Sequence, residues 1–180
     1  YVWIRDVMVL SLARQELPLW LASHRAARIQ DWDALTRAND ALYVLRETAE
    51  FRLESSQMGH SMAKLFKQWH GGDALLALSE ISWVYPSAHA ALSAVSGIDE
   101  QMALTAYLWS WVENQSIAAI KIIPLGQIDG QVLLHRLKAD IETAIQTAMS
   151  IDPENIGSAA VGLSIASARH ESQYSRLFRS

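Results

Sequence analysis

The 180-residue sequence contains no cysteine, which excludes a disulfide framework and thiolate metal sites. It also shows no secretory signal, so we expect a cytoplasmic protein. Its longest apolar stretch, residues 102–123, is interrupted at Glu113, Asn114, Gln115 and Lys121. A membrane span rarely tolerates four such residues at that depth. We therefore predict a buried helix here, and no membrane partner.

The sequence also lacks an excess of positive charge. Its formal net charge is −4 and its pI is about 5.8, whereas proteins that bind nucleic acid in general carry a basic face. The glycine-rich motifs that cradle phosphates, G-x-x-x-x-G-K-[ST] and G-x-G-x-x-G, are missing as well. We expect no nucleic-acid partner and no nucleotide hydrolysis by this chain alone.

Signatures of catalysis and of metal binding are similarly scarce. No serine stands in a G-x-S-x-G elbow, and no acidic pair has a local context that demands a raised pKa. None of the six histidines has another within four residues, so we interpret each as a lone surface or capping histidine. We predict acidic residues scattered over solvated faces and no metal site within the chain. A site shared between subunits stays open.

Helical periodicity runs through almost the whole sequence. Hydrophobic residues make up 51%, seven residues are tryptophan, and no alternating run of strand length stands out. We predict one all-α domain, a single-domain helical bundle over residues 1–180. Helices are expected over about 1–15, 18–29, 32–69 (as two helices or one bent helix), 73–81, 86–96, 99–123, 128–148 and from 155 into the C-terminal tail.

Apolar spacing predicts which faces of these helices are buried. Residues 99–123 are apolar nearly all round, which is typical of a central helix. One buried stripe is expected at Met58, Met62, Leu65, Phe66 and Trp69, and a second at Ile128, Val132, Leu134, Leu137, Ile141, Ala144, Ile145 and Ala148. A face of small residues, which would let another helix approach closely, is expected at Ser158, Gly162 and Ala166.

The polar triplet Glu113-Asn114-Gln115 interrupts the predicted central helix. Buried amides and carboxylates without partners cost about 1–3 kcal/mol each, so a triplet inside the core must be hydrogen-bonded. We interpret it as a core network that fixes helix register. The alternative is a polar surface presented to a partner or lining a channel.

The C-terminal segment, residues 174–180, is unusually apolar and basic for a chain end. Tyr174, Leu177 and Phe178 fall on one face of a helix, with Arg176 and Arg179 beside that face. These residue types are enriched at interface hot spots. Composition alone leaves two interpretations open, which are a docking peptide and an end that folds back on its own domain.

Two long, ordered motifs carry a resemblance to a known family. The stretch AYLWSWVENQSIAAIKIIPLGQIDGQVLL, Ala106 to Leu134, and the ending SARHESQYSRLFRS strongly resemble the UreF family of urease accessory proteins. A weaker match is the segment Ser56-Gln57-Met58-Gly59. The resemblance covers the whole chain, with one departure. Members usually begin with a segment containing glycine, serine and tyrosine, which we do not find, so we expect that it was trimmed or cleaved.

The resemblance implies an all-helical, non-catalytic accessory protein that forms a homodimer. Such proteins assemble with a second accessory protein, UreD (UreH in some bacteria), and with the GTPase UreG. The complex delivers nickel to apo-urease, whose active site holds two nickel ions bridged by a carbamylated lysine. In this family the C-terminal end becomes ordered against UreD/UreH, and UreF has been viewed as a regulator of the UreG GTPase. Nickel would be handled by the complex, with no cofactor bound permanently here.

These expectations give two candidate partner-binding surfaces. The first is the docking tail with its supporting helix, comprising Tyr174, Arg176, Leu177, Phe178, Arg169 and His170. The second comprises Glu113, Asn114, Gln115, Lys121, Gly126, Gln127, Asp129 and Gly130. Two other functions stay open, namely a helical enzyme with an apolar pocket lined by tryptophans and a nickel-binding protein with its site at the dimer interface.

Overall fold

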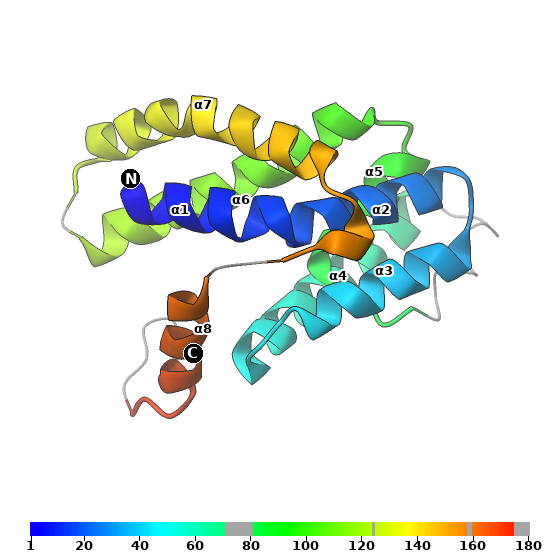
Figure 1. The fold of residues 1–180 in the computed structure, drawn as a ribbon, viewed down its shortest axis with the longest axis horizontal. Coiled ribbons are helices and arrows are strands. Elements are labelled where there is room, and N and C mark those ends of the chain that lie inside the picture. Colours follow the sequence, from blue (N-terminus) through cyan, green and yellow to red (C-terminus); the bar gives the residue numbers. More distant parts are fainter. Residues whose placement is uncertain (71–80, 124, 158–159, 175–180) are drawn as a thin grey trace.

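The computed structural model describes the chain except for residues 71–80, 124, 158–159 and 175–180 (Figure 1). The described part contains helices and no strand, which confirms the all-α class. Its elements are α1 (Val2–Leu10), η1 (Leu12–Arg14), α2 (Glu16–Arg28), α3 (Trp32–Val44), α4 (Ala49–His70), α5 (Tyr85–Val95), α6 (Glu100–Ile122), α7 (Gln127–Ser150), η4 (Pro153–Asn155) and α8 (Val161–Glu171).

The main core lies where α1, α2, α6 and α7 meet. Met8, Leu17, Leu104, Leu108 and Leu137 are fully buried there. A second cluster joins α2, α3 and α5. Each large apolar side chain removed from water contributes about 1.5–3 kcal/mol, so the two clusters supply most of the driving force for folding.

Side-chain caps fix the starts of two helices where the sequence predicts them. The carboxylate of Asp31 accepts from the Ala34 amide at 2.9 Å, at the start of α3. The carboxylate of Asp99 accepts from the amides of Gln101 and Met102 at the start of α6. Such caps satisfy amides that have no partner within the helix.

Several predicted helix boundaries need correction. The helix predicted over residues 1–15 ends at Leu10 and is followed by the separate turn η1. The final helix does not start near Asn155, because Ile156 is extended and the Gly157 amide donates to the Arg14 carbonyl at 3.1 Å. α8 therefore begins at Val161. The region 32–69 is two helices, α3 and α4, and the helix predicted over 73–81 lies almost wholly outside the described residues.

The predicted stripe on α4 is wrong. Met58, Leu65 and Trp69 are 39%, 41% and 71% exposed, and of the predicted set only Phe66 is buried. α4 packs mainly on α5, so periodicity marks an apolar face that no described element fully covers.

The predicted stripe on α7 is wrong in part. Ile128 and Val132, at the start of α7, are 80% and 60% exposed, whereas the stripe from Leu134 to Ala148 is buried as predicted. The hairpin of α6 and α7 extends beyond the start of α1, so this end lacks a covering helix (Figure 1). In the small-residue face, Gly162 and Ala166 are exposed and Ser158 lies outside the described residues, so the close approach of another helix there stays a prediction.

α6 is not buried all round either. Its buried residues are Ala103, Leu104, Tyr107, Leu108, Val112 and Ser116, all on one side. Met102, Ile117 and Ile122 are 66%, 44% and 61% exposed. α6 therefore lies over the core with part of its apolar surface exposed, rather than being enclosed on all sides. In the described ranges, no helix is long and apolar enough to cross a membrane.

Gly59 permits the closest approach of α4 to α5. A Cβ placed there would lie 2.6 Å from the backbone carbonyl carbon of Val84, at the start of α5. No side chain fits at that distance, which explains why a glycine is needed in the Ser56–Gly59 segment.

Candidate functional site

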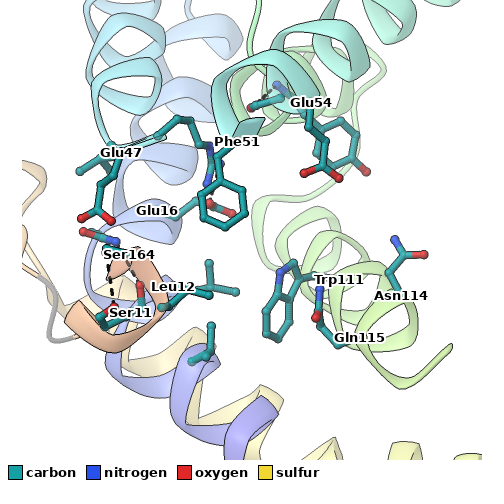
Figure 2. Close-up of a pocket in the computed structure, with 18 of the residues that line it drawn as sticks. Ser11, Leu12, Glu16, Glu47, Phe51, Glu54, Trp111, Asn114, Gln115 and Ser164 are labelled. Atoms are coloured by element: carbon teal, nitrogen blue, oxygen red, sulfur yellow. Dashed lines mark hydrogen bonds and ion pairs between the residues drawn. The ribbon is translucent and has the colours of Figure 1, made fainter. Parts of the chain in front are cut away.

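A pocket of about 490 Å³ opens between α1–η1, the start of α4, α6 and α8 (Figure 2). Trp3 of α1, Phe51 of α4 and Trp111 of α6 form apolar walls. Leu163 closes it from α8. The pocket thus joins elements from both ends of the chain. It is lined by two of the tryptophans, a feature that the alternative of a helical enzyme with a tryptophan-lined pocket required.

A buried ion pair lies at the floor of this pocket. The Arg46 guanidinium, from the α3–α4 connection, contacts the Glu16 carboxylate at 2.6 Å, and the Tyr107 hydroxyl donates to the same carboxylate at 2.6 Å. Glu16 is 4% exposed and Tyr107 is 3% exposed. Buried charges are tolerated when they are paired and hydrogen-bonded in this way. The prediction that acidic residues lie on solvated faces is wrong for Glu16.

Burial and the Glu16 carboxylate together shift the pKa values of Arg46 and Tyr107. Burial opposes the charged form of Arg46, but the neighbouring groups, with Glu16 first and Glu54 among them, together outweigh burial, so the pKa of Arg46 is raised. Burial, and after it the negative charge of Glu16, raises the pKa of Tyr107 well above its ordinary value. The tyrosine is therefore a neutral donor, and the pair is a structural network rather than a poised acid and base.

Behind the pocket, two histidines pack into an aromatic cluster. The ring of Trp20 stacks on that of His24 with centroids 5.4 Å apart, and it lies 5.8 Å from His89 and 6.0 Å from Tyr107. Nε2 of His24 donates to the Ile98 carbonyl at 3.2 Å. Burial lowers the pKa of both histidines, to about 4 for His89. The surface or capping interpretation is wrong for these two neutral histidines, of which His24 is fully buried and His89 half-buried in the cluster.

The polar triplet of α6 is a surface feature and not a core network. Glu113 and Asn114 are exposed and Gln115 is half-buried, so the predicted buried network is wrong. Asn114 and Gln115 line the pocket (Figure 2). The alternative, a polar surface presented to a partner or lining a channel, stays a prediction, since the structure shows only that these two residues line a pocket.

The rest of the second predicted surface lies away from the pocket. Lys121 is exposed near the end of α6, and Gly126, Gln127 and Asp129 are exposed at the start of α7, where Asp129 accepts from the Gly126 amide at 3.1 Å. Gly130 is buried, and a Cβ there would overlap the Ile120 side chain of α6. The predicted surface is thus split between the pocket and the α6–α7 end, and its role in binding stays a prediction.

α8 contacts the start of α4 through polar groups. The Thr48 and Ser167 hydroxyls lie 2.8 Å apart, and the Glu171 carboxylate accepts from the Ala49 amide at 2.6 Å. Nδ1 of His170 lies 2.6 Å from the Glu50 carboxylate. His170, a predicted partner-binding residue, therefore has a partner within the chain.

Only the first part of the predicted docking tail lies in the described residues. Arg169 is exposed on α8, and Tyr174 beyond it is fully exposed. Arg176, Leu177 and Phe178 lie outside the described residues. Docking and back-folding both stay open on this geometry.

Sequence reasoning missed Glu16, Arg46 and the two histidines of the aromatic cluster. Nothing local distinguishes Glu16 from a solvated helix residue, since its partner Tyr107 is 91 residues away. Among the residues that the structure describes, no three histidine, aspartate or glutamate side chains gather where they could hold a metal ion.

Comparison with known proteins gives one consistent result. A UreF family model matches residues 1–138. Proteins named urease accessory protein UreF are 46% identical in Cupriavidus pinatubonensis strain JMP 134 and 40% identical in Ralstonia pickettii strain 12J, each over 99% of this chain and 80% of the relative. The protein of that name from Pseudomonas fluorescens strain Pf0-1 is 44% identical over 99% of this chain and 81% of its own length. The chain therefore belongs to the UreF family.

Proposed function

We propose that this chain is a non-catalytic accessory protein in the maturation of urease. The observation that carries the proposal is its identity of 40–46% with proteins named urease accessory protein UreF over 99% of the chain. Within the site, the buried Glu16 carboxylate is bound by Arg46 and Tyr107, which is expected of a group that holds the fold together.

The proposed partners are a UreD/UreH-type accessory protein, a UreG-type GTPase and apo-urease, within the cytoplasm. The sequence contains no phosphate-binding loop, so nucleotide hydrolysis would be supplied by the separate GTPase chain. Nickel is cargo of the assembled complex in this proposal. We further propose that the chain works as a homodimer and regulates the GTPase by contact.

Two exposed surfaces support a function by contact. The α6–α7 end exposes Ile117, Ile122 and Ile128 at 44%, 61% and 80%. Separately, α8 leads to Tyr174, with Val161 and Ile165 exposed. Large exposed apolar side chains gathered in this way are typical of protein interaction sites.

The proposal is tested by complementation. Cells that carry a urease operon without its own UreF-type gene should contain inactive, nickel-poor urease, and expression of this chain should restore both nickel content and activity. A matched control expresses the chain without residues 174–180. If the full chain, expressed to normal levels, leaves urease nickel-poor, the proposed function is wrong.

A further inference from the structure

The pocket between α1, α4, α6 and α8 carries an unbalanced charge that the proposed function does not use. Its charged lining residues are Glu16, Glu47, Glu54 and Arg46. Three carboxylates therefore face one guanidinium. Because Glu16 is paired with Arg46 at 2.6 Å, the excess negative charge belongs to Glu47 and Glu54.

Glu47 and Glu54 are available for a ligand. Both are exposed, and no hydrogen bond or ion pair joins either of them to a described residue; the charge of Glu54 also acts on Arg46, but without direct contact. Figure 2 shows them on opposite sides of the pocket, with Phe51 between them. A cation that enters the pocket would lie in the field of both carboxylates, in a cavity whose apolar walls strengthen that field.

The walls suit an apolar stem. Trp3 and Trp111 lie on α1 and α6, while Met58 and Phe51 lie on α4. Trp3 is 55% exposed and Met58 is 39% exposed, so both present apolar surface to an incoming group. Lysine and arginine side chains bury their methylene stems against such surfaces while the charged head finds a polar partner. Indole faces add a cation–π attraction.

We propose that this pocket binds a lysine or arginine side chain of a partner protein. An anion is disfavoured by the excess carboxylates, and Arg46 is already engaged by Glu16. A bare metal ion is disfavoured because the walls are aromatic and no metal-binding cluster occurs among the described side chains. The identification of the ligand as a protein side chain rests on the proposed function. The preference of the pocket for a cation with an apolar stem rests only on its lining residues.

The test is a titration of the full chain with single-side-chain probes, followed by the indole N–H signals of Trp3 and Trp111 in NMR spectra. The probes are the Nα-acetyl methylamides of arginine, lysine, norleucine and glutamate. The two cationic probes should shift these signals saturably, and the neutral norleucine probe should bind at least ten-fold more weakly. The glutamate probe should not bind.

Matched variants locate the charge that is recognised. Glu47→Gln/Glu54→Gln should weaken the cationic probes at least ten-fold with only a small change in melting temperature, since both side chains are exposed and Glu54 acts on Arg46 only through its charge. Glu142→Gln, an exposed carboxylate of α7 outside the pocket, should leave binding unchanged.

Three results would overturn the proposal. The first is norleucine binding as well as arginine, and the second is no saturation by either cation up to about 50 mM, well above the millimolar range of single contacts. The third is a gain in probe affinity in Arg176→Gln/Arg179→Gln, which would assign the pocket to the chain's own tail. These titrations use the chain alone, so their failure would leave the complementation result intact, and failed complementation would not alter probe binding.

Discussion

The Tyr107 hydroxyl, in the first half of α6, donates a 2.6 Å hydrogen bond to Glu16, the first residue of α2. The same carboxylate receives Arg46 from the α3–α4 connection. Three segments far apart in the sequence therefore meet at one buried negative charge. This arrangement sets the floor of the pocket, and its energetics can be measured directly.

Arg46→Met should destabilise the fold by about 3–5 kcal/mol, because it leaves the buried Glu16 charge without its cation. Tyr107→Phe should cost less, about 1–3 kcal/mol, since it removes one hydrogen bond and retains the ring. Denaturant unfolding at neutral pH measures both. The double variant Glu16→Gln/Arg46→Met should recover part of the loss, whereas additive losses would show that the two side chains are not coupled.

The lowered pKa of His89 predicts that the folded chain loses stability in mild acid. Burial lowers the pKa of His89 from 6.5 to about 4 in the folded chain. Between pH 6.5 and pH 4, His89 is protonated in the unfolded chain but still neutral in the folded chain. The free energy of unfolding therefore falls as pH drops from 6.5 towards 4. At about 1.4 kcal/mol per pH unit, the loss from this group is about 3 kcal/mol at most.

Unfolding experiments at pH 7 and pH 4.5 on the native chain and on His89→Phe measure this contribution. The variant should lose less stability than the native chain over that interval, because its ring cannot take up a proton. His60→Gln, at an exposed position of α4, should retain the native loss. Equal losses in the native chain and His89→Phe would mean that His89 does not titrate as the structure requires.

Gly59 and Gly162 form a matched pair of helical glycines. Gly59→Ala should destabilise by about 1–3 kcal/mol, because the new Cβ meets the backbone of Val84 and one helix must shift. Gly162→Ala should stabilise by about 0.5–1 kcal/mol, because no atom lies within 4 Å of the added Cβ and alanine favours helix. Thermal melts compare them, and a neutral Gly59→Ala would contradict the close approach of α4 to α5.

The polar contacts of α8 should control its local opening. Ser167→Ala/Glu171→Gln removes the hydroxyl pair with Thr48 and weakens the bond to the Ala49 amide. A lost hydrogen bond is worth about 1 kcal/mol, so amides of α8 should exchange about five-fold faster or more in hydrogen-exchange experiments. Core amides should be unaffected. Arg169→Gln, exposed on the same helix, is the control and should keep native rates.

The sequence predicts where helices start better than it predicts which of their faces are buried. Helix starts at Asp31 and Asp99 follow from local chemistry, because a cap is made by residues a few positions away. The stripe at Met58, Leu65 and Trp69 fails because periodicity identifies an apolar face without identifying what covers it. The same reasoning explains the exposed end of α7.

The pocket could not be predicted from the sequence, because its polar groups come from distant segments. Glu16 and Tyr107 are 91 residues apart, and neither has an unusual local context. By contrast, family membership follows from the order of specific motifs. These motifs can be recognised in the sequence without any three-dimensional argument. The Glu113–Gln115 triplet combines both situations. Its motif could be recognised in the sequence, but its exposure to solvent could not be predicted from it.

The central claim is that this chain works by binding other proteins of urease maturation, with residues 174–180 as a docking element. Its most direct test is co-purification of the tagged chain with a UreD/UreH-type partner, for the native chain and for a variant without Tyr174–Ser180. The variant should keep the native helical content and melting temperature. We expect the native chain to recover the partner and the shortened chain to lose it. Recovery of the partner by a folded, shortened chain would contradict the docking role, and failure of the native chain to recover it would contradict the central claim.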